Sequence, residues 1–106
     1  MNLTNIAKVK TIADHYGVNV QLDMLVEECA ELIQAVQKVK RFNDTDKEPA
    51  AWLDFTGELA DVAIMLEQMK YYLTPGLSQE YEKAVIEKLD RQLDRIEKEN
   101  NDGENN

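Results

Sequence analysis

The sequence predicts an all-α protein organised as a four-helix bundle. Apolar residues recur every three or four positions along most of the chain, which is the period of a helix. No segment alternates strictly between apolar and polar residues, as a half-buried strand would. Turn-forming residues then separate the periodic stretches, at Gly17, in the polar loop 43–48 and at Thr74-Pro75-Gly76.

The four helices are expected at residues 3–16, 19–41, 49–73 and 78–98. Asn19 and Ser78 are the candidate N-caps of the second and fourth helices, and Pro49 suits the first turn of the third. These helices form one domain, residues 1–98. The polar segment 99–106 has no apolar residue to anchor it, so it is expected to be disordered.

Each helix carries an apolar stripe, and the stripe of the second helix is unusually regular. It comprises Leu22, Leu25, Val26, Cys29, Leu32, Ile33 and Val36. A chain of 106 residues buries only about two thirds of its unfolded surface, which leaves a small core. We therefore expect the helices to associate with further copies, as a homodimer or homotetramer.

The composition excludes several classes of partner. With 12 Lys and Arg against 21 Asp and Glu, the net charge of −9 would repel a polynucleotide. A free nucleotide remains possible, since a metal ion can bridge acidic groups to phosphates. No segment reads as a signal peptide or as a membrane span, so no membrane partner and a cytoplasmic location are expected.

The acidic residues of the second and third helices lack basic partners. Between Leu22 and Gln37 there are acids but no Lys or Arg, and the same holds between Glu48 and Met69. Each pair of like charges one helical turn apart destabilises a helix by roughly a few tenths of a kcal/mol. The fourth helix instead interleaves acids and bases at i,i+4 spacing, as an ordinary solvated face does.

Helical periodicity places some of these acids among apolar residues. Glu58 falls inside the apolar stripe of the third helix, and Asp61 lies at its edge. Glu28 flanks the stripe of the second helix, whereas Glu31 points further away. A buried carboxylate normally protonates or binds a cation. Two i,i+3 pairs on facing helices would offer hard oxygen ligands, which suit Mg²⁺ or Mn²⁺.

Other metal sites lack the necessary ligands. A di-iron bundle requires Glu-x-x-His motifs, but the single histidine, His15, lies on the first helix. The loop after the second helix begins like an EF-hand, yet Pro49 stands where that loop requires glycine. Zinc is disfavoured because the chain has only Cys29 and His15 as soft or borderline ligands.

The ordered pair of motifs Glu27-Glu28-x-x-Glu31 and Glu58-x-x-Asp61 resembles the MazG-like nucleoside triphosphate pyrophosphohydrolases. The resemblance covers about residues 20–96. It implies that Glu28, Glu31, Glu58 and Asp61 bind Mg²⁺ and that Glu27 orients or deprotonates the attacking water. It also implies cleavage between the α and β phosphates, which releases a nucleoside monophosphate and pyrophosphate.

The same resemblance implies phosphate contacts from basic residues of the fourth helix. Lys88, Arg91 and Arg95 lie close together on one side of that helix, although a salt-bridged exposed face would look the same. Asp54 stands where many MazG-like sequences carry a lysine. Trp52 is a candidate for stacking on a base, and the alternative is an ordinary core position.

The sequence thus predicts a Mg²⁺-dependent enzyme that hydrolyses nucleoside triphosphates and so clears or adjusts a nucleotide pool. Two alternatives stay open. One is a non-catalytic helical interaction module in which the metal is structural, and the other is a phosphoribosyl-ATP pyrophosphohydrolase. Neither the base nor the sugar of the substrate follows from the sequence.

Overall fold

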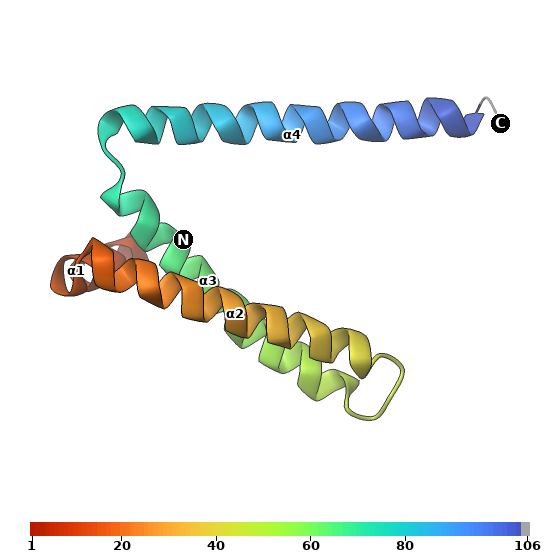
Figure 1. Ribbon diagram of the computed structural model, residues 1–106, viewed down its shortest axis with the longest axis horizontal. Helices are drawn as coiled ribbons and strands as arrows, with labels where there is room; N and C mark the ends of the chain where they lie inside the picture. The colour runs from red at the N-terminus through yellow and green to blue at the C-terminus, as the bar shows by residue number, and fades with distance from the viewer. Residues whose placement is uncertain (105–106) are drawn as a thin grey trace. The chain divides into compact units, whose positions relative to one another are not determined.

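The computed structural model describes residues 1–104, and within this range it contains four helices and no strand. The helices are α1 (Leu3–Tyr16), α2 (Val18–Arg41), α3 (Glu48–Tyr72) and α4 (Pro75–Glu104) (Figure 1). The predicted all-α class is confirmed, and each observed helix overlaps its predicted segment.

The chain divides into two compact units, Met1–Tyr72 and the part from Leu73 onward. In the first unit, α2 and α3 lie side by side as an antiparallel hairpin, and α1 packs against both at one end (Figure 1). The second unit consists of α4. The sequence predicts one domain over residues 1–98, and the two units are described separately below.

Two helix starts differ from the sequence-based expectation. Gly17 has a φ of 82°, so it ends α1 in the left-handed region and α2 begins directly after it, without the proposed cap at Asn19. At the other junction, the backbone N–H of Leu77 donates to the Thr74 hydroxyl over 3.3 Å. Thr74 therefore caps α4, and Ser78 lies inside the helix.

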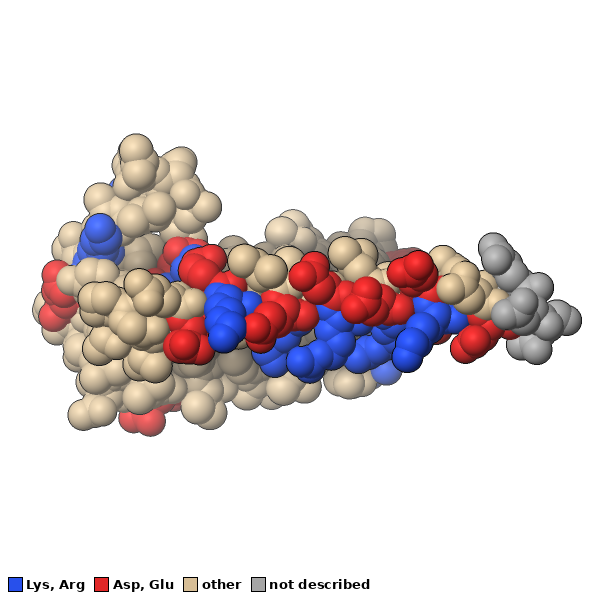
Figure 2. Space-filling view, turned by 90° about the horizontal axis from the view of Figure 1, so that it is seen from above, with Lys and Arg blue, Asp and Glu red and all other residues tan. Residues whose placement is uncertain are grey.

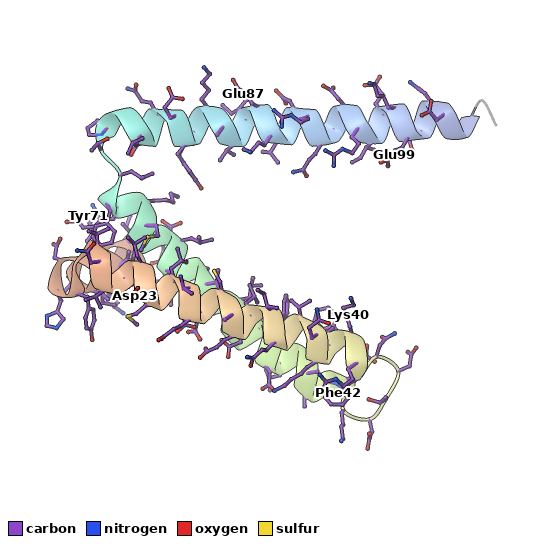
Figure 3. The ribbon with its side chains drawn as sticks, in the orientation of Figure 1. Asp23, Lys40, Phe42, Tyr71, Glu87 and Glu99 are labelled. Carbon is purple, nitrogen blue, oxygen red and sulfur yellow. The ribbon has the colours of Figure 1, made fainter. Side chains whose placement is uncertain are left out.

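A compact loop joins α2 to α3. The Phe42 ring has the Arg41 guanidinium at 5.7 Å and the Lys47 ammonium at 5.3 Å from its centre (Figure 3). Asp44 adopts a left-handed φ of 61°, and its N–H donates to a carboxylate oxygen of Glu48 over 3.1 Å. These local contacts define the turn, and thereby the register in which α3 returns along α2.

Side-chain hydrogen bonds attach α1 to the end of α3. The Tyr72 hydroxyl donates to the carbonyl of Ala13 over 2.7 Å, and the Tyr71 hydroxyl donates to the Asp14 carboxylate over 2.6 Å (Figure 3). Ala13 is fully buried, so α1 approaches α3 closely at this point. The buried apolar core is small and consists of Val9, Ala13, Ala35, Ala51, Val62 and Met65.

Only part of the apolar stripe predicted for α2 is buried: Leu25, Cys29 and Leu32 are half-buried, and the rest of the stripe is exposed. Val26 is 70% exposed and Ile33 is 61% exposed, whereas the side of α2 that faces α3 carries Gln21, Glu28 and Ala35. The predicted stripe is wider than one neighbouring helix can cover. Polar residues therefore lie in the interface while apolar ones remain at the surface.

Helix α4 is long, amphipathic and exposed along its length. It continues through segment 99–104, which the sequence analysis expects to be disordered, and residues 105–106 lie outside the described part. Lys83 and Glu87 approach each other to 4.0 Å on its surface. Within residues 1–104, none of the helices combines the length and the apolar run that a membrane span requires.

Shortening Met65 should destabilise the first unit, because this side chain is only 4% exposed between the three helices. Met65→Ala is expected to lower the free energy of unfolding by about 2–5 kcal/mol in chemical denaturation. Leu3→Ala is the control, since Leu3 is 85% exposed and its removal should change stability by less than about 0.5 kcal/mol. Equal losses in the two variants would contradict this packing.

Candidate metal centre

Four carboxylates from two helices converge at the middle of the α2–α3 hairpin. Glu28 and Glu31 lie one turn apart on α2, and Glu58 and Asp61 lie one turn apart on α3. Each residue contributes one carboxylate oxygen to a group whose members all lie within 4.8 Å of one another. The antiparallel pairing of two i,i+3 motifs produces this group, here called the carboxylate cluster.

Two of the four acids in the carboxylate cluster are partly shielded from solvent. Glu28 and Glu58 are half-buried, and each has a buried Oε2 atom without a hydrogen-bond partner. Glu31 and Asp61 are exposed. A buried carboxylate oxygen without a donor is costly, and a cation bound by the four oxygens would offset that cost. The all-oxygen donor set suits a hard divalent ion.

Burial and mutual repulsion both disfavour the ionised form of the two inner carboxylates. Burial raises the pKa of Glu28, and the neighbouring charges of Asp61, Glu31 and Glu58 raise it further. The pKa of Glu58 is raised first by burial and then by the neighbouring charge of Glu31. Without a cation, Glu28 and Glu58 therefore retain protons at a higher pH than isolated carboxylates do.

An open cleft of about 700 Å³ adjoins the carboxylate cluster between α2 and α3. Three of the four acids line it, together with Gln34 and Lys38 of α2. Sequence reasoning missed Lys38, although it follows Glu31 by seven residues and so lies on the same side of the helix. Lys38 is a basic residue in the wall of a cleft whose other charged lining residues are acids.

Two other predicted residues lie outside the carboxylate cluster. Glu27 is exposed on α2 and is not one of the four converging acids. Trp52 is 49% exposed and packs edge-on against Phe55, with ring centres 5.5 Å apart. It lines a shallow apolar depression between α2 and α3 rather than the cleft beside the acids.

The predicted phosphate-binding residues Lys88, Arg91 and Arg95 are exposed on α4. Figure 2 shows basic side chains gathered along one side of this helix, with acidic side chains beside them. This separation of charge agrees with the pattern read from the sequence. The three residues belong to the second unit, whereas the carboxylate cluster and its cleft are built entirely from the first.

Comparison of the chain with protein-family models, with curated proteins and with solved structures finds no match. The function is therefore inferred from the chemistry of the site, and the family resemblance is an expectation from the sequence.

Divalent cations should stabilise the protein most strongly near neutral pH. Because Glu28 and Glu58 have raised pKa values, the folded state binds protons more tightly than the unfolded state does. Metal-free stability should then fall as pH rises from about the ordinary value of 4.5 through the raised values. A cation at 100 times its Kd adds about 2.7 kcal/mol at neutral pH, and protons should compete with it at pH 5.

Thermal melts with and without Mg²⁺ at both pH values measure this effect. Glu58→Gln should remove the Mg²⁺-dependent rise in Tm, and it should stabilise the metal-free protein because a charge leaves the helix interface. Asp23→Asn is the matched control, since Asp23 is an exposed acid on α2 outside the cluster (Figure 3). An equal Mg²⁺ response in Glu58→Gln and in the unaltered protein would contradict the assignment.

Proposed function

We propose that this chain is a Mg²⁺-dependent nucleoside triphosphate pyrophosphohydrolase of the MazG-like kind. The observation that supports the proposal best is the carboxylate cluster, with its two unpartnered buried oxygens beside an open cleft. A triphosphate is a highly charged anion, so an acidic cleft can accept it only together with cations. The cluster and Lys38 would meet that requirement together.

Glu28, Glu31, Glu58 and Asp61 would hold the magnesium. A bound Mg²⁺ neutralises phosphate charge and lowers the pKa of a coordinated water. Lys38 would donate hydrogen bonds to a phosphate oxygen from the cleft wall. The α2–α3 hairpin orients these groups before substrate arrives, which favours electrostatic stabilisation of the developing charge.

The proposed reaction is the attack of water on the α-phosphorus. The bond between this phosphorus and the α–β bridging oxygen breaks, and pyrophosphate leaves with the bonding electron pair. A carboxylate accepts the proton of the water, and by the family resemblance this would be Glu27, which is exposed on α2 beside Glu28. By the family resemblance, Lys88, Arg91 and Arg95 would add phosphate contacts and Trp52 a contact to the base.

Release of pyrophosphate from a panel of ribo- and deoxyribonucleoside triphosphates tests this proposal. Turnover should require Mg²⁺ or Mn²⁺, and it should fall by more than about 100-fold in Glu58→Gln and in Asp61→Asn. Asp23→Asn should retain full activity. Absence of metal-dependent turnover on every nucleotide, or full turnover in both cluster variants, would refute the proposal.

The same panel separates the alternatives. A helical interaction module with a structural metal would show Mg²⁺-dependent stabilisation without turnover. A phosphoribosyl-ATP pyrophosphohydrolase would act on that compound and leave the common nucleotides intact.

We also propose that the protein forms a homodimer or homotetramer. Large apolar side chains are exposed on α2, including Val26 and Ile33, and contiguous apolar surface of this kind is typical of an interface. Further exposed apolar residues follow one side of α4: Tyr81, Val85, Leu89, Leu93 and Ile96.

Sedimentation at micromolar concentration measures the oligomeric state. The double change Val26→Glu with Ile33→Glu should dissociate the oligomer, because it would place four charges in each two-fold interface. Leu3→Glu changes an exposed residue of α1 and should leave the assembly intact. A folded, active monomer at this concentration would refute self-association.

A further inference from the structure

A second, smaller cavity of about 160 Å³ lies among α1, α2 and α3. It shares Glu28 and Asp61 with the carboxylate cluster. Gln21 of α2 and Gln68 of α3 line its inner wall, since they are only 1% and 2% exposed. This cavity is here called the glutamine pocket.

The two glutamines have unused hydrogen-bonding groups. Neither Nε2 nor Oε1 of Gln21 has a partner, and Oε1 of Gln68 has none. A buried amide group left without a partner costs about 1–3 kcal/mol, and nearly all buried polar groups in proteins are paired. A ligand that both donates and accepts hydrogen bonds would satisfy the unpaired amide groups of Gln21 and Gln68.

The position of the glutamine pocket relates it to the carboxylate cluster. Gln21 precedes Glu28 by seven residues on α2, and Gln68 follows Asp61 by seven residues on α3. Because the helices run antiparallel, both glutamines lie displaced from the cluster in the same direction, by about 10 Å along the helix axes. A nucleotide is extended in the same way, with its base separated from its phosphates by the sugar.

The size of the glutamine pocket limits the kind of ring that fits. A cavity of about 150 Å³ in another protein accommodates a single benzene ring, and the present volume is about 160 Å³. A six-membered ring therefore matches this volume more closely than the fused double ring of a purine does. At the rim, Tyr16 is 50% exposed and offers an aromatic face for stacking.

We propose that the glutamine pocket binds the pyrimidine ring of a nucleotide whose phosphates lie at the carboxylate cluster. Each carboxamide offers one acceptor and two donor hydrogens, which match the carbonyl, ring nitrogen and amino or imino groups along a pyrimidine edge. This inference rests on the proposed function for the identity of the ligand as a nucleotide. Ordered water alone would satisfy the same amides without any preference between bases.

Binding can be measured without hydrolysis by titrating the protein calorimetrically with α,β-methylene analogues of UTP, CTP, ATP and GTP in the presence of Mg²⁺. At least one pyrimidine analogue should bind about tenfold or more tightly than either purine analogue. Gln21→Met and Gln68→Met conserve side-chain volume and remove the amides. Each should weaken pyrimidine binding by about tenfold or more and leave purine binding unchanged.

Thermal melts confirm that each variant folds and still responds to Mg²⁺. If either glutamine variant fails to fold, Tyr16→Ala at the exposed rim provides the test instead. This change should weaken pyrimidine binding several-fold. Equal affinity for all four analogues, binding of none, or pyrimidine binding unaffected by these changes would overturn the inference.

Failure of this inference is distinguishable from failure of the proposed function. Purine and pyrimidine triphosphates could release pyrophosphate equally, with no effect of the glutamine changes. That result would support the proposed hydrolase function and overturn the assignment of the glutamine pocket as a pyrimidine site. Selective pyrimidine binding that the glutamine changes abolish, without turnover of any nucleotide, would support the pocket and refute the hydrolase.

Discussion

Carboxylates occupy the interface between two long helices at positions where an ordinary helical hairpin would place leucine or alanine. Glu28 and Glu58 are half-buried there, and Glu31 and Asp61 complete the cluster from its exposed side. Burial and repulsion act in the same direction, since both raise the pKa of the two inner acids. The hairpin is therefore built around a site that either protons or a cation must neutralise.

The polar character of this interface extends beyond the acids. Gln21 and Gln68 continue it by two helical turns toward α1, and Ala35 and Ala51 close the other end with small side chains. Leu25 and Leu32 of α2 are half-buried and Met65 of α3 is buried, while other apolar residues of α2 are exposed. Such an arrangement places polar groups in the interior of a small unit and leaves apolar side chains of α2 at its surface.

The sequence was sufficient to predict the helices and the carboxylate cluster, because i,i+3 spacing and helical period are local properties. Glu58 stood out because it interrupts an apolar stripe without a basic residue nearby. The rotation of α2 about its axis was not predictable in this way, since its apolar residues span more of the helix than α3 covers. Sequence reasoning did not identify Gln21, Gln68 or Lys38, because single polar residues on a helix are ordinarily surface residues.

Crystals grown with Mn²⁺ in place of Mg²⁺ would test the central claim most directly, through the anomalous scattering of manganese. An anomalous peak at coordination distance from oxygens of Glu28, Glu31, Glu58 and Asp61 is the expected result. Well-ordered carboxylates with no peak among them, at a neutral pH and a millimolar concentration of manganese, would show that protons alone neutralise the cluster. That result would contradict the assignment of a metal centre.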